Sequence, residues 1–201
     1  VDGTSAECSQ HHLWAVCDKS GEHSIRSADD IAKDYFRCFP CGQTNYKYKL
    51  PGVSPVEFAD AKPLPLHPYL VGALIGDGSL SGSGIRITSA DKEVVDRVAA
   101  CIPSGCSVKK EARYAYRIVH DKGSGARKAG RKLPLIDGLQ EIGLRGLRSY
   151  EKHIPSTYLL ASKEDRLELL RGLMDTDGSA SGGRVTYHTS SRRLSEDVLF
   201  L

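Results

Sequence analysis

The sequence contains no long hydrophobic run. Its longest apolar stretch, from Tyr69 to Gly76, is far too short to span a bilayer, and its first residues lack the basic and then apolar layout of a signal peptide. The 201 residues suffice for one large or two small domains, and 40% hydrophobic with 26% charged residues is ordinary for a soluble globular protein. We therefore expect an intracellular, cytoplasmic protein without a membrane partner.

The sequence also lacks the two spaced cysteine pairs that make a strong zinc motif. Cys38-Phe-Pro-Cys41 has the spacing of a zinc knuckle, and Cys8, Cys17 or His12 would have to complete a set of four ligands. An incidental turn is the alternative that we favour. All six cysteines are expected to stay as thiols in a reducing compartment.

What the chain does contain is a repeated motif. Leu70-Val-Gly-Ala-Leu-Ile-Gly-Asp-Gly78 and Leu170-Arg-Gly-Leu-Met-Asp-Thr-Asp-Gly178 each predict an apolar helix with an internal glycine and a carboxylate at its end. A Gly-Ser turn and a short alternating strand follow in both copies. Because the offset stays near 100 residues through helix, turn and strand, chance is a poor explanation. A duplicated unit with one acid per copy predicts a site of paired carboxylates.

The internal glycines indicate how the two copies meet. Gly72 and Gly172 each cost about 1 kcal/mol against alanine in a helix, and close approach of another backbone is the usual compensation. If the helices pack there, Asp77 and Asp177 emerge side by side, where they repel unless a cation lies between them. Mg²⁺ suits such a pair, and the layout is that of metal-assisted phosphodiester hydrolysis. For a single copy, a stop-and-turn signal is the alternative.

Both stretches resemble the LAGLIDADG (DOD-type) motif of homing endonucleases, and the second copy is the closer match. The resemblance implies two αββαββα halves with the motif helices at their interface, and it implies that the last acid of each motif binds the metal. Those roles fall on Asp77 and Asp177. Asp175 has only Ile75 opposite it in the first copy, so we interpret it as helix-end structure.

The net charge of +3 hides a strongly basic segment. Between Ser107 and Lys132, nine basic residues stand against two acidic ones, a local charge of +7 that leaves −4 for the rest of the chain. Tyr114 and Tyr116 are interleaved with these charges on a predicted strand pair around a Gly-Ser-Gly loop. A solvated loop is the alternative, but contact with DNA phosphates is the better interpretation. The predicted DNA-binding residues here are Lys109, Lys110, Arg113, Arg117, Arg127, Lys128, Arg131 and Lys132.

The strand after each motif has one polar face. Period-two alternation separates Arg86 and Thr88 from the isoleucines between them, and it separates a second polar set from Val185 and Tyr187. A two-stranded ribbon can enter a major groove, so we predict that these polar faces contact double-stranded DNA. A strand with one wet face would show the same pattern. The second polar set is Arg184, Thr186 and His188.

Lys152-His-Ile-Pro155 resembles a block that precedes the second motif in endonucleases carried by inteins. The resemblance places Lys152 at the active centre, where an ammonium stabilises the developing phosphorane charge or positions the attacking water. A surface lysine before a turn is the alternative. Around it, we predict a capping box at Ser162, an amphipathic helix over Leu133–Leu144, and helices that begin after Ser89 or Asp91 and after Ser190 or Ser191.

The first 66 residues resemble part of an intein (Hint) splicing domain. In Ser9-Gln-His-His12 the serine takes the threonine position of a Thr-x-x-His block, and His12 takes the histidine that helps polarise the first scissile peptide bond. A packed or exposed strand histidine is the alternative for His12 taken alone. His11 is a weaker candidate because Cys8 would then occupy the threonine position.

The resemblance is incomplete at both ends. No splicing nucleophile and no terminal asparagine can be assigned, and only 23 residues follow the second motif. We therefore expect an internal fragment or an eroded copy that does not splice and cuts DNA weakly or not at all. Five prolines in Pro51–Pro68 predict an extended linker.

The predicted fold class is α+β. A partial, all-β Hint-like module and its linker over residues 1–66 are expected to precede a LAGLIDADG endonuclease domain over residues 67–201, with an incomplete second repeat. The predicted function is a monomeric, intein-encoded, Mg²⁺-dependent DNA endonuclease joined in cis to host exteins. A catalytically inactive nucleic-acid-binding protein, either an RNA maturase or a DNA-binding regulator, is the second hypothesis. A free-standing endonuclease is the third, and His12 argues against it.

Overall fold

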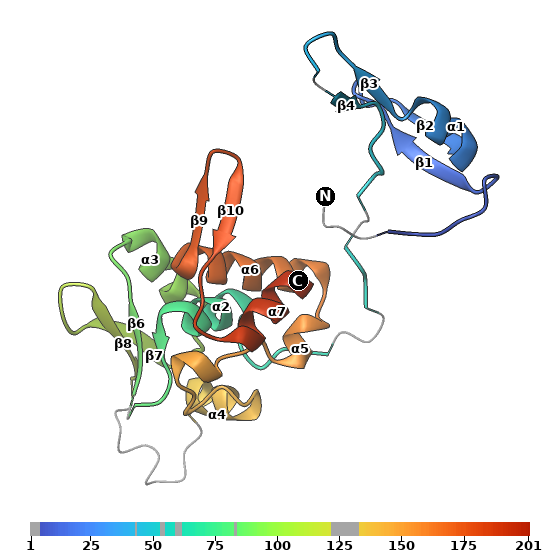
Figure 1. Cartoon of the computed structure of the whole chain (residues 1–201). Coiled ribbons are helices and arrows are strands. Elements are labelled where there is room, and N and C mark those ends of the chain that lie inside the picture. Colours follow the sequence, from blue (N-terminus) through green and yellow to red (C-terminus); the bar gives the residue numbers. More distant parts are fainter. Residues whose placement is uncertain (1–4, 43, 53–54, 59–61, 83, 122–132) are drawn as a thin grey trace. The chain divides into compact units, whose positions relative to one another are not determined.

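The structure is a computed structural model that describes residues 5–42, 44–52, 55–58, 62–82, 84–121 and 133–201. The chain divides into two compact units, Val1–Pro55 and Val56–Leu201, which we describe separately (Figure 1). In the described part of the chain, no helix has the length and apolar character needed to cross a membrane.

The first unit is built from short strands and one helix. Its elements are β1 (Leu13–Cys17), β2 (His23–Ser27), α1 (Ala28–Asp34), β3 (Phe36–Cys38) and β4 (Thr44–Tyr46). β1 pairs antiparallel with β2, and β3 with β4. Ser27 starts α1 because its hydroxyl accepts a hydrogen bond from the Asp30 amide. The expectation of an all-β module is therefore wrong for this unit. The sequence Ala28–Asp34 has a serine N-cap and acidic residues in its first turn, which favour a helix.

The second unit contains the two motif helices. Its elements are α2 (Pro68–Asp77), β5 (Gly78–Ser79), β6 (Ile85–Thr88), α3 (Lys92–Cys101), β7 (Cys106–Lys110), β8 (Ala115–His120), α4 (Pro134–Glu141), the 3₁₀ helix η2 (Ser149–Glu151), α5 (Ser156–Leu159), α6 (Lys163–Asp177), β9 (Gly178–Ser181), β10 (Arg184–Tyr187) and α7 (Arg192–Phe200). From α2 to α4 the order is α-β-β-α-β-β-α, and α6, β9, β10 and α7 repeat its first four elements.

The helices α2 and α6 cross at their internal glycines. A Cβ placed on Gly72 would lie 2.2 Å from the Leu169 carbonyl oxygen, and one on Gly172 would lie 2.3 Å from the Tyr69 carbonyl oxygen. Real side chains cannot come so close, so only glycine permits this backbone contact. The predicted reason for these glycines is confirmed. The short separation fixes the relative position of the two helix ends that carry Asp77 and Asp177.

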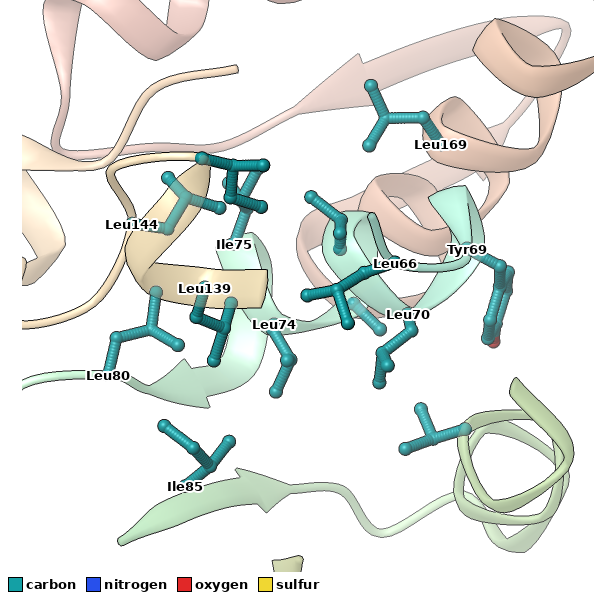
Figure 2. Packing of buried hydrophobic residues seen from close by; sticks show 14 of the residues in the cluster. Leu66, Tyr69, Leu70, Leu74, Ile75, Leu80, Ile85, Leu139, Leu144 and Leu169 are labelled. Atoms are coloured by element: carbon teal, nitrogen blue, oxygen red, sulfur yellow. The ribbon is translucent and has the colours of Figure 1, made fainter. Parts of the chain in front are cut away.

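A four-stranded antiparallel sheet of order β5-β6-β8-β7 packs beside α2. Ile85 and Ile87 of β6 are buried, while Arg86 and Thr88 on the other face are not, as predicted. Figure 2 shows α2, β6 and α4 contributing to one hydrophobic core. Residues Pro68 to Ile75 of α2 are all buried, because α6 covers one side of the helix and the sheet, α3 and α4 the others.

The hairpin of β9 and β10 has a different environment. It is a separate two-stranded sheet, and Val185 on β10 is 71% exposed. The sequence pattern assigned Val185 to an apolar face together with Tyr187, and only Tyr187 packs against the core. Among the described residues no third strand pairs with β10, so alternation alone does not bury this face.

The boundary between the two units lies at Pro55 and Val56, earlier than the predicted boundary at Leu66. The Val56 carbonyl oxygen accepts a hydrogen bond from Arg166, and the guanidinium of Arg166 lies over the ring of Phe58. Leu66 is buried and exchanges two hydrogen bonds with the Tyr158 hydroxyl. These contacts attach the second half of the proline-rich segment to the motif-bearing unit.

Candidate active site

Asp77 and Asp177 are the last helical residues of α2 and α6. Each helix ends at a glycine whose amide donates to a carbonyl oxygen four residues earlier, and a Cβ on Gly78 or Gly178 would collide with that turn. A Cβ placed on Gly76, the residue before Asp77, would lie 3.4 Å from the Asp177 Oδ2 atom. The two carboxylates therefore meet at one end of the helix pair, as the motif predicts.

The electrostatics of this pair are unfavourable in the absence of a cation. Burial raises the pKa of Asp77, and the charge of Asp177 raises it further. Burial also raises the pKa of Asp177, against the charges of Lys152 and His188. Asp77 is nonetheless solvent-accessible, so ions and substrate oxygens can reach the pair. Two partly desolvated carboxylates with raised pKa values form a site that gains from binding a cation.

Lys152 lies next to both aspartates and is only 5% exposed. Its Nζ atom donates to the carbonyl oxygens of Gly76 and Gly78, at 2.8 Å each, so the ammonium caps the C-terminal end of α2. Burial lowers the pKa of Lys152, and the two aspartates oppose that shift. An ammonium has three N–H donors, and these two bonds leave one for a further acceptor.

The backbone around Lys152 is held by the start of α7. The Ser191 hydroxyl donates to the Lys152 carbonyl oxygen at 2.6 Å and accepts from the Leu194 amide as the N-cap of the helix. Asp197 accepts from the Ile154 amide at 2.8 Å. Consequently, the lysine that caps the first motif is positioned by the helix that follows the second motif.

These groups surround a cavity of about 510 Å³. Three of its lining residues are the acids and the lysine that the sequence predicted, and His188, whose amide donates to the Asp177 carbonyl oxygen at 3.1 Å, is a fourth. The complete lining is Ile75, Gly76, Asp77, Ser149, Lys152, Asp177, His188, Thr189, Ser190 and Leu194.

The donor set fits a hard divalent cation. Mg²⁺ is commonly held by one or two carboxylates and completes its octahedral shell with water and phosphate oxygens. Asp77 and Asp177 supply that number, and the described residues contain no group of three or more His, Cys, Asp or Glu side chains placed to hold a metal. A cation here would retain open positions for water or substrate.

Asp175 lies outside this constellation. Its carboxylate accepts from the Tyr69 hydroxyl at 2.9 Å and pairs with Arg97 at 2.8 Å. The Arg97 guanidinium also lies over the Tyr69 ring, 4.0 Å from its centroid. Asp175 thus ties α6 to α2 and α3, in agreement with its interpretation as a structural residue.

Part of the predicted DNA-contacting set lies on one face of the four-stranded sheet. Register places Arg86 opposite Arg117 and Arg117 opposite Lys109, which forms a basic row across three strands. Glu111 pairs with both arginines. The strands β7 and β8 are connected by a turn at Glu111–Tyr114 and not by the predicted Gly-Ser-Gly loop. The Glu111 and Ala112 amides both donate to the Ala115 carbonyl oxygen and close this turn.

The remaining predicted DNA contacts are dispersed. Thr88 is exposed at the end of β6, Arg113 lies over the Tyr114 ring in the β7–β8 turn, and Lys110 lies on the opposite face of β7 from Lys109. On the other hairpin, Arg184, Thr186 and His188 are exposed. Arg127, Lys128, Arg131 and Lys132 lie outside the described residues.

Ser9 and His12 belong to the first unit, just before β1. The His12 amide donates to the Ser9 carbonyl oxygen at 2.9 Å, and the imidazole lies edge-on to the Trp14 ring at 5.1 Å. Both residues are exposed. Their predicted splicing roles stay predictions.

None of the six cysteines is in a disulfide, and Cys38 and Cys41 flank a turn closed by a hydrogen bond from the Gly42 amide to the Phe39 carbonyl oxygen. Within the described chain no four-ligand set gathers around this pair.

Sequence reasoning missed one polar group near the acids. The Tyr187 hydroxyl is buried, and it has no hydrogen-bond partner among the described residues. Burial raises the pKa of Tyr187, with smaller contributions from Asp177 and Asp77. Alternation assigned this side chain to an apolar face, and its phenol ring with a hydroxyl set it apart from Ile87, which takes the matching register position in the first copy.

The comparisons with known proteins agree with the motif. Residues 164–201 match a LAGLIDADG-like domain. This stretch begins in α6, includes Asp177 and extends through the β9–β10 hairpin to the end of the chain. The match therefore supports a link to the LAGLIDADG endonuclease family for the second motif.

Several curated proteins are similar to a larger share of the chain. The replicative DNA helicase DnaB of Mycobacterium intracellulare is 34% identical over 132 residues, which are 65% of this chain and 17% of the helicase. DnaB of Rhodothermus marinus is 35% identical over 141 residues, which are 64% of this chain and 15% of that helicase. RecA of Mycobacterium tuberculosis H37Rv is 29% identical over 159 residues, which are 72% of this chain and 19% of that RecA protein. The chain thus spans less than a fifth of the length of these relatives.

Proposed function

We propose that this chain is a site-specific DNA homing endonuclease of the LAGLIDADG (DOD) type, carried in an intein, that hydrolyses phosphodiester bonds of double-stranded DNA with Mg²⁺. The observation that carries the proposal is the meeting of Asp77, Asp177 and Lys152 at one end of two helices that cross at their glycines. The order of elements in the second unit, α-β-β-α-β-β-α followed by α-β-β-α, supports a double-motif endonuclease fold.

Each residue has a distinct task in this proposal. Asp77 and Asp177 provide the anionic oxygens that hold the cation. Burial raises both pKa values and the charge of Asp177 raises that of Asp77 further, so a bound cation would stabilise the charged forms. Bound Mg²⁺ would act as a Lewis acid and orient the phosphate. Lys152 fixes the end of α2 through two carbonyl oxygens and retains one N–H to stabilise negative charge that develops on the phosphate.

The basic row of the four-stranded sheet supports a nucleic-acid partner. Arg86, Arg117 and Lys109 extend across three strands on the face opposite the buried isoleucines. Glu111 offsets part of this charge in the free protein. Phosphate oxygens can replace that carboxylate when DNA binds, and the protein positions itself on the duplex through such contacts.

The intein context is supported by the relatives. Helicases and RecA are different proteins, yet the chain matches a small part of each, and the matched shares of the chain overlap. A segment that occurs inside different host proteins is what a mobile inserted element produces. The Ser9 to His12 block adds to this interpretation, and the host exteins would be partners in cis.

Cation binding and DNA cleavage test the proposal directly. We expect the unaltered chain to bind Mn²⁺, used here as a paramagnetic probe for Mg²⁺, and to bind duplex DNA with a steep salt dependence. Asp77→Asn with Asp177→Asn should abolish cation binding, while the matched control Asp175→Asn should retain it. A version in which the second repeat has the full αββαββα order is expected to cut long DNA at very few sites once divalent metal is added, whereas the present chain should cut weakly or not at all.

Two outcomes would contradict the proposal. Cleavage that persists in the Asp77→Asn, Asp177→Asn variant would refute the assigned chemistry. Sequence-selective nucleic-acid binding without any metal-dependent cleavage would favour the inactive binding protein, either an RNA maturase or a DNA-binding regulator, and the choice between RNA and DNA as the tighter ligand would separate those two.

A further inference from the structure

His188 lies in the wall of the carboxylate cavity, and the proposed chemistry gives it no task. It lines this cavity together with both acids and Lys152. Its amide donates to the Asp177 carbonyl oxygen at 3.1 Å, which fixes the residue beside the second acid. The sequence pattern placed His188 on a polar strand face with Arg184 and Thr186, and neither of those residues lines the cavity. The structure therefore separates His188 from that strand face.

The internal repeat shows that this position is specific to the second half. His188 matches Thr88, because the residue before each of them pairs with the glycine that follows a motif acid. Thr88 is the last residue of β6, pairs with Ala115 of β8 and does not line the cavity. In the second half, β10 ends one residue earlier, at Tyr187. His188 consequently lies beyond the strand, where the chain continues along the cavity.

The residues that follow His188 continue the same wall. Thr189 and Ser190 also line the cavity, and Ser191 is the N-cap of α7. The Ser191 amide donates to the Thr189 hydroxyl at 3.1 Å, and the Ser191 hydroxyl donates to the Lys152 carbonyl oxygen at 2.6 Å. The connection between β10 and α7 is therefore held at both ends, by the second motif and by the backbone of Lys152. A segment that is already ordered loses little entropy when a ligand binds to it.

An imidazole in this cavity has two possible tasks, as a metal ligand or as a hydrogen-bond donor to the substrate. A metal ligand would have to join the two acids, but the described residues contain no group of three or more His, Cys, Asp or Glu side chains placed to hold a metal. A donor, in contrast, is useful here. Lys152 has two of its three N–H groups bound to backbone carbonyl oxygens, and a phosphate group presents several acceptor oxygens.

We propose that the His188 side chain donates a hydrogen bond to an oxygen of the DNA phosphate that the cation between Asp77 and Asp177 holds. This inference rests on the proposed function. It moves His188 from the predicted contacts with bases in the major groove to the phosphate at the carboxylate site. It also gives the second half a substrate contact that the first half lacks, because Thr88 lies outside the cavity.

Duplex affinity with and without a cation separates the two locations of His188. Binding of a mixed-sequence duplex is measured at one salt concentration, with Ca²⁺ as the oxygen-binding cation and then in a chelator. We expect His188→Ala to lose about three- to tenfold in affinity with Ca²⁺, the size of one ordinary hydrogen bond, and to lose nothing in the chelator. His188→Gln keeps an N–H donor and should recover most of the loss. For the matched control Thr88→Ala, any loss should be the same in both conditions.

The sequences selected from a random duplex library are the second readout. A phosphate contact carries no direct sequence information, so His188→Ala should select the same sequences as the unaltered chain. A changed selection, or an equal loss of affinity in the two conditions, would return His188 to the major groove and overturn the inference. Unchanged affinity in both conditions would overturn it too.

Mn²⁺ binding without DNA keeps this inference distinct from the proposed function. Weaker Mn²⁺ binding by His188→Ala would make the imidazole a metal ligand and would also overturn the inference. In all of these cases an unaltered chain that binds Mn²⁺ and duplex DNA leaves the endonuclease proposal intact. An unaltered chain that binds neither probe would overturn both.

Discussion

The glycine at the helix crossing offers the most direct test of how the fold creates the site. A Cβ on Gly172 would lie 2.3 Å from the Tyr69 carbonyl oxygen and 2.8 Å from the Ala73 amide nitrogen. Both are backbone atoms of buried residues of α2, so Gly172→Ala cannot be accommodated by a side-chain rotation. The helices α2 and α6 must separate, and overpacking of this kind costs about 1–3 kcal/mol.

The net effect follows from two opposing contributions. Alanine regains about 1 kcal/mol of helix propensity, so we expect a net loss of roughly 2 kcal/mol from the upper end of the overpacking range. For a protein of this size that loss lowers the melting temperature by about 4–8 °C. Mn²⁺ affinity should fall as well, because separation of the helices moves Asp177 away from Asp77.

Thermal unfolding followed by circular dichroism measures this change, and Gly82→Ala is the matched control. A Cβ on Gly82 meets nothing closer than 3.7 Å, and Gly82 lies in the same unit between β5 and β6. A Gly172→Ala protein that melts with the Gly82→Ala control and binds Mn²⁺ normally would refute the claim that backbone contact at the glycines builds the site.

Three further changes have defined outcomes. Asp77 and Asp177 have pKa values raised above 3.8, so the metal-free fold loses stability as pH rises from that value through the raised pKa values. Asp77→Asn with Asp177→Asn should remove this pH dependence from thermal melts across the acid range. An unchanged pH dependence would contradict the assignment. Lys109→Ala with Lys110→Ala should flatten the log–log salt dependence of duplex binding by about 0.9 for each DNA phosphate that these lysines neutralise, and an unaltered slope excludes them from the interface. Asp175→Asn should cost about 1 kcal/mol in chemical denaturation, because the Arg97 pair is partly exposed, while Mn²⁺ affinity stays the same; a loss of affinity would place Asp175 in the site.

The sequence allowed accurate prediction wherever a local pattern has a single structural solution. The motif glycines predicted the helix crossing, Ser162 and Asp91 start the helices that their capping residues indicated, and period-two alternation placed the buried face of β6. In each case the determining contacts lie within a few residues of the pattern, or depend on the absence of one side chain.

The sequence placed Lys152 near the acids, but it did not predict contacts between residues that are distant in the chain. The ammonium of Lys152 binds carbonyl oxygens 76 and 74 residues earlier, which the tetrapeptide around it does not encode. The boundary at Leu66 was displaced because Arg166, 110 residues after Val56, bonds to that residue's carbonyl oxygen. Composition marked the proline-rich segment as a linker, but side chains far along the chain determine which part of it is attached to the second unit.

The two motifs demonstrate why a repeat predicts positions better than chemistry. The backbone of each copy ends in the same way, with a glycine whose missing Cβ lets the chain turn directly from helix to strand. That shared geometry places Asp77 and Asp177 together. Their surroundings are not shared, because Lys152 caps only the first helix and a tyrosine replaces Ile87 in the second half. The backbone of the two motifs is therefore repeated, but the side chains around Asp77 and Asp177 are not. A duplex bound across the two halves would present its two strands to chemically different surroundings.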